Sequence, residues 1–303
     1  MISTLELRRF KRFQELTLCF KALTVLTGAN GVGKTSIIHA LLLVHQATLL
    51  KQNEVLRLND VDSLQLGSAR DLIHHQSGSD TMEVTVNVDD TPMSWTFSAP
   101  EDEYSRHFNV IKRPETCIGA LAEISTQRFV YLSAERLGPR DTLRAGSQES
   151  REVGVGVQGE YTAQTLVSAG TFKVREERCL PMPDGGLLRG ILHQTEAWMS
   201  RIVRPIQLEP EWFPETLVTR LRFRTPGFSS NWMRAPNMGF GVSYALPIVV
   251  AALRAPVGSL LLIENPEAHL HPAGQSAMGE FLALMAADGL QILVETQGDC
   301  TKF

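Results

Sequence analysis

Cysteine is scarce in this sequence of 303 residues, and no two cysteines form a Cys-x-x-Cys pair. The four are scattered along the chain, at Cys19, Cys117, Cys179 and Cys300. A zinc ribbon needs paired cysteines, and a disulfide framework needs a dense, regularly spaced set. The lack of both patterns excludes these architectures and is typical of a protein from a reducing compartment.

Long hydrophobic runs are also missing. The longest covers residues 245–253, whereas about 20 residues are needed to cross a bilayer. The first residues carry charges where a secretory signal would need an apolar stretch. We therefore expect a cytoplasmic protein without a membrane partner.

Neither sign of charge dominates. The net charge is −4, with 20% charged and 43% hydrophobic residues, which is ordinary for a globular protein and gives no strong overall field. A local basic cluster stands near the start, formed by Arg8, Arg9, Lys11 and Arg12. It is either a basic patch or the solvated face of an edge strand, and both interpretations stay open.

The first third of the chain alternates strand and helix patterns. Residues 3–10 and 16–27 read as strands, and a glycine-rich turn separates the second from a helix over 34–50. Ile37, Leu41 and Val44 recur at helical spacing, which predicts one buried face. Val84, Val86 and Val88 alternate with polar residues, so 81–88 and 94–97 are predicted to form an antiparallel hairpin.

The middle of the chain gives weaker patterns. A strand over 128–133, a long loop over 137–160, a helix over 187–203 and a strand over 217–223 are predicted. Heptads are not sustained anywhere, so we expect no long coiled-coil arm.

The end of the chain is easier to interpret. Residues 259–264 and 291–296 are short apolar strands, and an amphipathic helix that begins at Pro272 lies between them. Two buried strands joined by a helix predict a crossover unit with parallel strands. The predicted fold class is α/β.

Residues 28–35 match the phosphate-loop pattern G-x-x-x-x-G-K-[ST], after a strand and before a helix as that pattern requires. Its glycines let successive N–H groups point at phosphate oxygens, while Lys34 would reach the terminal phosphates and Thr35 would bind Mg²⁺. We expect ATP and Mg²⁺ as cofactors. The predicted nucleotide-binding residues here are Gly28, Ala29, Asn30, Gly31, Val32, Gly33, Lys34, Thr35 and Ser36.

A metal carboxylate is predicted at the end of the strand over 259–264. Glu264 follows four apolar residues, and the carboxyl end of such a strand is where ligands bind in open α/β sheets. The alternative is a strand-terminal Glu that faces solvent. His269 and His271 do not form a zinc pattern, and His271 is interpreted as a helix N-cap or a loop contact.

Residues 264–272, of sequence Glu-Asn-Pro-Glu-Ala-His-Leu-His-Pro, closely resemble the distal block of ABC-type ATPases related to the SMC, RecF and OLD proteins. The segments 5–13 and 23–35 resemble the first block of the same group. The match is closest to a bacterial subgroup of predicted AAA family ATPases, whose pattern is also similar to 131–140, 159–162 and 239–247.

This resemblance implies an ABC-type head that dimerises head to tail across two ATP molecules. The segment 237–243 would then contact the γ-phosphate held by the partner, through Gly239, Gly241 and Ser243, just before a helix over 244–253. A flexible loop before a core helix is the alternative. Arg136 and Arg140 would contact phosphate or a partner, or would be surface loop arginines.

Three departures from the resemblance bear on catalysis. Asn265 stands where such heads carry the Glu that polarises water, and an amide cannot accept a proton, so this role is lost or passes to Glu267. Gln297 replaces a His that contacts the γ-phosphate. Such heads also continue beyond the position of Phe303, so either this is a shortened chain or its effector is a separate polypeptide. The metal-sensing glutamine is Gln65 or Gln76.

We expect a single ATPase head over 1–303. Its parts are a phosphate-loop lobe (1–50), a hairpin (80–100), an inserted helical and β region (160–230) and a last lobe (231–303). The last lobe holds the segment 237–243 and Glu264. The predicted function is an ATP-dependent dimeric switch with slow hydrolysis, coupled to a separate effector, such as a nuclease, in DNA processing, DNA repair or phage defence. DNA itself stays an open partner. A non-hydrolysing scaffold is the alternative, and a small-molecule kinase is a distant third.

Overall fold

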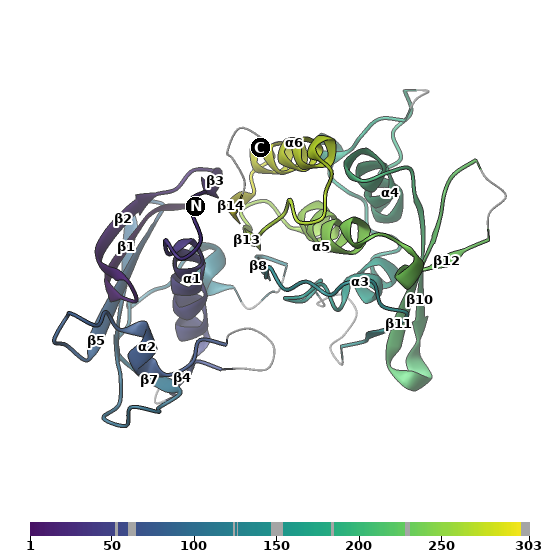
Figure 1. The fold of residues 1–303 in the computed structure, drawn as a ribbon. Coiled ribbons are helices and arrows are strands. Elements are labelled where there is room, and N and C mark those ends of the chain that lie inside the picture. Colours follow the sequence, from purple (N-terminus) through teal and green to yellow (C-terminus); the bar gives the residue numbers. More distant parts are fainter. Residues whose placement is uncertain are drawn as a thin grey trace. The chain divides into compact units, whose positions relative to one another are not determined.

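The computed structural model describes residues 1–51, 54–59, 65–123, 125, 127–146, 154–182, 185–227 and 231–297. Its chain forms two compact units, shown in Figure 1. The first comprises Met1–Thr24 and Ala29–Ile124, and the second Val25–Gly28 and Ser125–Phe303. Each unit is considered separately. The prediction of one head over the whole chain stays a prediction.

The first unit is built on a six-stranded antiparallel sheet of order β2-β1-β5-β6-β7-β4. The strands are β1 (Ile2–Phe10), β2 (Phe13–Cys19), β4 (Leu56–Arg57), β5 (Thr81–Val88), β6 (Thr91–Ser98) and β7 (His107–Lys112). The same unit holds helices α1 (Lys34–Leu49) and α2 (Ala69–Leu72) and the short turn η1 (Gly119–Ala122). Strand β3 (Leu23–Leu26) leads from this unit to the second.

The predicted hairpin over 81–97 is confirmed as β5 and β6. Val84, Val86 and Val88 are buried as the alternation predicts. The turn is tighter than expected, because Asp89 and Asp90 both adopt positive φ, the conformation of a two-residue hairpin turn. Strand β6 therefore begins three residues earlier than predicted.

The predicted strand over 16–27 is wrong as a single element. The structure divides it into β2 and β3, with a break at Phe20. Phe20 is buried, its backbone N donates to Ser3 O (2.8 Å), and Lys21 N donates to Thr24 Oγ1 (3.0 Å). The Phe20 contact continues the pairing of β2 with β1, and the Lys21 contact then closes a turn that separates β3. A pattern of apolar residues alone does not reveal this turn. Helix α1 is also more deeply buried than one face requires, since Ile38, Ala40, Leu42 and Leu43 are buried as well.

The second unit contains a parallel sheet of order β3-β14-β13-β8, in which β13 (Leu260–Glu264) pairs parallel with β8 (Phe129–Leu132) and β14 (Gln291–Glu295). The crossover helix is α6 (Pro272–Ala287). Helices α4 (Ile191–Ile202), α5 (Phe240–Arg254) and α6 pack on one another beside this sheet. The predicted α/β class with a parallel sheet, helices and an added antiparallel β part is confirmed.

A second, smaller sheet in this unit has the order β10-β11-β12, with β9 also paired to β11. Its strands are β9 (Leu143–Arg144), β10 (Gln207–Phe213), β11 (Val218–Arg224) and β12 (Met233–Arg234). Helix α3 (Thr162–Ser168) packs against β10 and β11. The short turns of the unit are η2 (Glu176–Arg178), η3 (Pro214–Thr216) and η4 (Ala235–Asn237). In the described residues, no helix exceeds the 16 residues of α1 and α6, in keeping with the expected lack of a long arm.

Two further expectations for the second unit need correction. The loop predicted over 137–160 contains β9, while its residues 147–153 lie outside the described part. The helix predicted over 187–203 is shorter and begins at Ile191. None of the helices that the structure describes is long and apolar enough for a membrane span.

Candidate nucleotide-binding site

The phosphate loop curls where the sequence places its glycines. Gly28, Gly31 and Gly33 have φ values of 140°, 80° and 98°, which side chains with a Cβ rarely adopt. Gly33 also leaves no room for a side chain, because a Cβ there would lie 2.6 Å from the Phe13 ring. The predicted strand–loop–helix context is confirmed, with Gly33 as the residue before α1.

Lys34 is the first residue of α1 and is only 6% exposed. Its Nζ donates to Ala29 O at 3.2 Å, across the loop. Arg12, from the turn between β1 and β2, donates to Gly31 O. The loop over 29–35 is therefore held by two cations of its own unit, Lys34 and Arg12.

The basic cluster near the start does not form one free patch. Arg8 pairs with Glu15 (3.3 Å) and Arg9 with Glu83 (2.7 Å). Lys11 Nζ lies 2.8 Å from His39 Nδ1. Burial lowers the pKa of Lys11 to about 8, and burial together with the nearby Lys11 charge lowers the pKa of His39 to about 3. The solvated-edge interpretation therefore accounts for Arg8 and Arg9, and not for Lys11 or for Arg12, which bonds the phosphate loop.

The two candidate metal-sensing glutamines lie in different places of the first unit. Gln76 lines a depression of about 540 Å³ together with Lys11, Arg12 and His74. Gln65 instead forms an isolated bridge with Asn59. Because Arg12 also bonds the phosphate loop, the geometry favours Gln76.

Glu264 ends strand β13 as predicted, but it does not face solvent. Its side chain is 6% exposed and accepts hydrogen bonds from Tyr131 Oη (3.0 Å) and Ala134 N (3.0 Å). Burial raises the pKa of Glu264 and also raises that of Tyr131. A buried carboxylate held by neutral donors is an oxygen ligand of the kind that Mg²⁺ takes in phosphate-transfer sites.

Arg136 is not a surface loop arginine. It is 3% exposed, and its guanidinium donates to three backbone carbonyls, Ser133 O (2.8 Å), Glu264 O (2.6 Å) and Asn265 O (2.6 Å). It also lies 5.3 Å from the Tyr244 ring centroid. Burial lowers the pKa of Arg136 to about 10, so it remains charged and holds the loop after β13 in place.

The two residues that depart from the family pattern lie near Glu267. Asn265 has φ 46° and its N donates to Glu295 O. Glu267 Oε1 accepts from Thr296 Oγ1 (2.6 Å) and from the backbone N of Gln297 (3.1 Å). Glu267 Oε2 is buried and has no hydrogen-bond partner among the described residues. Glu267 thus keeps one oxygen that could accept a proton.

The helix predicted over 244–253 begins earlier, at Phe240, so Gly241 and Ser243 lie in its first turn. Close packing explains this boundary. A Cβ on Gly241 would lie 2.7 Å from the carbonyl oxygen of His269, so a glycine allows α5 to start directly against the loop after β13. Gly241 is therefore explained by its close packing against His269, and not by a need for a flexible loop.

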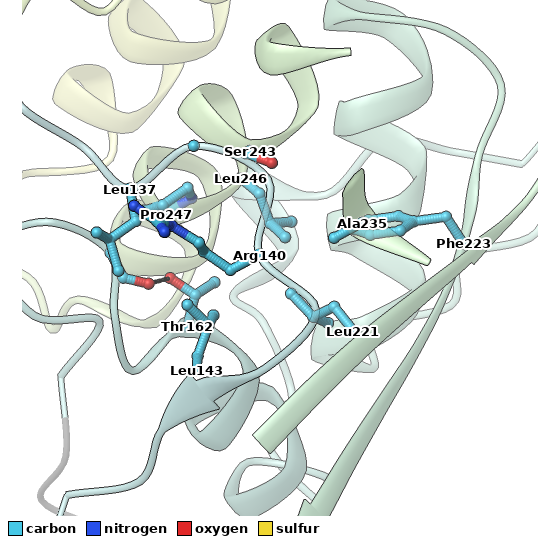
Figure 2. Close-up of a pocket in the computed structure, with 12 residues that line it drawn as sticks. Leu137, Arg140, Leu143, Thr162, Leu221, Phe223, Ala235, Ser243, Leu246 and Pro247 are labelled. Carbon is cyan, nitrogen blue, oxygen red and sulfur yellow. Dashed lines mark hydrogen bonds between the residues drawn. The ribbon is translucent and has the colours of Figure 1, made fainter. Parts of the chain in front are cut away.

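Gly239, Gly241 and Ser243, which the resemblance assigns to the γ-phosphate, do not all line the same hollow. Gly239 and Gly241 line an open depression of about 660 Å³ with Arg204, His269 and His271. Ser243 instead lines a cavity of about 30 Å³ with Arg140, Thr162 and Pro247, shown in Figure 2. Only the first of these hollows is large enough for a phosphate group.

The two histidines after β13 make separate contacts. The side chain of His271 caps α6 by accepting from Ala273 N (3.5 Å), as one of the two interpretations predicted. His269 packs on the rings of Phe240 (5.2 Å) and Tyr244 (4.7 Å). In the part of the chain that is described, no three His, Cys, Asp or Glu side chains are grouped to hold a metal.

Two family models match the sequence. Residues 1–135 match the family described as "AAA ATPase domain". Residues 207–297 match the family described as "AAA domain, putative AbiEii toxin, Type IV TA system". The two matches cover the phosphate loop and Glu264. No curated protein matches this chain.

Solved structures of SMC heads share the fold. The Smc head bound to the C-winged helix domain of ScpA is 17% identical, with a TM-score of 0.58, covering 98% of this chain and 90% of that one. The Smc head with an extended coiled coil, bound to the C-terminal domain of ScpA derived from Pyrococcus furiosus, is 15% identical, with a TM-score of 0.57 and the same coverage. The chain thus matches two AAA families, each over less than half of its length, and has the fold of SMC heads.

Proposed function

We propose that this chain is an ATP-dependent dimeric switch that closes on Mg-ATP and reopens after slow hydrolysis. The observation that supports the proposal is the presence of two separate features with the chemistry to bind phosphate. One is the phosphate loop with Lys34, and the other is the open depression at the start of α5, lined by Gly239 and Gly241. Helix N-termini and cationic side chains both favour phosphate, so a second copy can complete each nucleotide site.

Thr35 and Glu264 would hold the Mg²⁺ ion. The metal would neutralise charge on the phosphates during transfer. Asn265 can orient a water molecule but cannot take its proton, and Glu267 has only one oxygen without a hydrogen bond among the described residues. Weak general-base help supports slow turnover.

Closing and reopening would change the surface that this chain offers to a separate effector polypeptide in DNA processing or phage defence. The match to a family described by a toxin of a toxin–antitoxin system supports such coupling. The two similar SMC heads are likewise each bound to part of another protein, ScpA.

The test is mass measurement by light scattering after size exclusion, combined with phosphate release. We expect a monomer without nucleotide, a dimer with Mg-ATP, and a turnover well below the roughly 1 s⁻¹ at the low end of ordinary enzymes. Dimerisation without any phosphate release would instead favour the non-hydrolysing scaffold, which Asn265 and Gln297 support. A mass that does not respond to ATP would contradict both functions.

The Glu264→Gln variant should separate the contribution of Glu264 to metal binding from its contribution to the stability of the fold. Burial raises the folded-state pKa of Glu264 above its ordinary value of 4.5. The ionised carboxylate therefore destabilises the fold. Stability is lost as the pH rises from 4.5 through the raised pKa. The amide can still bond Ala134 N and Tyr131. We expect the variant to unfold at a temperature equal to or above that of the wild type at pH 8.

The same variant should lose the extra stabilisation that Mg-ATP gives over ATP with EDTA, because its carboxylate ligand is gone. Both quantities come from thermal unfolding followed by circular dichroism at pH 5 and pH 8. Full retention of the Mg²⁺-dependent stabilisation would remove Glu264 from the metal site.

A further inference from the structure

The small sheet of the second unit has one face that packs inward and one that does not. On β11, Thr219, Leu221 and Phe223 are buried, and α3 packs against this strand. The alternate residues Arg220, Arg222 and Arg224 therefore point to the opposite, outward face. Figure 1 shows β10 and β11 as a long pair on which this face lies.

The outward face is rich in arginine. Register places Arg144 of β9 opposite Val218, and Arg234 of β12 opposite Arg222. Among the described residues, this face carries five cations with the three arginines of β11, against three carboxylates, Glu209, Glu211 and Asp141. A surplus of two positive charges stands out in a chain of net charge −4.

The carboxylates orient the arginines but do not use all of their N–H donors. Arg220 pairs with Glu211 at 2.7 Å, and Arg222 pairs with Glu209 and Glu211, each at 2.9 Å. A guanidinium has five N–H donors, so each of these arginines keeps donors for another acceptor. Within the described part of the chain, the hydrogen bond of the Arg224 guanidinium goes to a neutral side-chain oxygen, that of Gln207 (2.9 Å).

Aromatic rings stand at both ends of the arginine row. Arg220 lies 5.0 Å from the Phe213 ring centroid, and Arg224 lies 4.6 Å from that of Trp232. Rings and guanidinium planes that stack together make flat surfaces on which an unpaired base can stack. Successive outward residues of a strand are spaced by roughly 6.6 Å, so each arginine can reach a separate phosphate.

We propose that the outward face of β9–β12 binds single-stranded nucleic acid, with Arg222 and Arg224 on the backbone and Trp232 under a base. The phosphates supply the negative charge that complements the arginine surplus, and an unpaired strand supplies the exposed bases that the stacked rings fit. A duplex offers phosphates but hides its base faces. The surface is separate from the nucleotide-binding residues, so the proposal does not depend on the dimeric switch.

The test is fluorescence anisotropy with labelled 20-nucleotide oligo(dT), oligo(U) and a duplex of matching length, over a range of salt concentrations. We expect both single strands to bind more tightly than the duplex. The double variant Arg222→Gln, Arg224→Gln should weaken binding at least tenfold and reduce the slope of log K against log salt by about 1.4, because about 0.7 is lost per phosphate contact. Trp232→Ala should weaken binding about tenfold, since one stacked base is worth about 1–3 kcal/mol.

Arg201→Gln is the matched control, because Arg201 is also paired with a carboxylate, that of Glu280 on α6, but lies outside the sheet. It should bind as the wild type does. Glu209→Gln should tighten binding, a change that a misfolded variant cannot produce. Equal binding by Arg201→Gln and the double variant, tighter binding of duplex, or no effect of Glu209→Gln would each overturn the proposal.

Discussion

Replacing Lys34 with alanine is expected to weaken ATP binding by about 100-fold or more. The lysine charge is buried beneath the loop, and in the structure its Nζ reaches across to Ala29 O. A hydrogen bond to a charged group contributes about 1.5–3 kcal/mol, and low exposure strengthens the attraction to phosphate further. Titration calorimetry with Mg-ATP measures the change directly.

Lys51→Ala is the control for this prediction, because Lys51 is exposed beyond the end of α1. It should bind ATP as the wild type does. The fold of Lys34→Ala should be intact by circular dichroism, since the hydrogen bond from Nζ to Ala29 O lies within the phosphate loop. An unchanged dissociation constant for Lys34→Ala would show that the loop does not bind the phosphates.

Replacing Arg136 with methionine is expected to destabilise the second unit by about 3 kcal/mol or more. The substitution leaves the buried carbonyls of Ser133, Glu264 and Asn265 without their shared donor, and loss of a buried polar network is among the most damaging of single changes. The measurement is the free energy of unfolding in urea, with the unfolding midpoint followed by tryptophan fluorescence.

Arg140→Met serves as the comparison, because Arg140 comes from the same segment but is exposed. Its free energy of unfolding should change by less than about 0.5 kcal/mol. Equal losses in the two variants would mean that the carbonyl contacts of Arg136 contribute little. Since Arg136 also fixes the loop after β13, Arg136→Met should in addition reduce Mg-ATP binding.

Local patterns predicted the parts of the fold that local rules govern. The phosphate loop, the strand ending at Glu264 and the helix from Pro272 each carry their own start and stop signals, and the structure has all three. Strand β10 was missed, because Pro210 lies inside it and proline removes a ladder donor. The strand tolerates this proline because it lies at the edge of its sheet.

The surroundings of the candidate site could be predicted only in part. Glu264 and Lys34 follow from motif and position, whereas the Tyr131 hydroxyl that bonds Glu264 comes from 133 residues away in sequence. The resemblance included Tyr131 and Arg136 in one block but did not assign them these contacts. Pairing of this kind depends on the register between β8 and β13, which a single sequence does not specify.

The missing Cβ of Gly241 has a consequence for communication between subunits. It brings the first turn of α5 against the carbonyl of His269, while Tyr244 of the same helix stacks on His269 and on Arg136. Arg136 in turn donates hydrogen bonds to the backbone carbonyls of Glu264 and Asn265. If Glu264 holds the metal and a second copy docks on α5, as proposed above, a change in the loop after β13 would be relayed to the start of α5, and docking would alter metal affinity by the same factor.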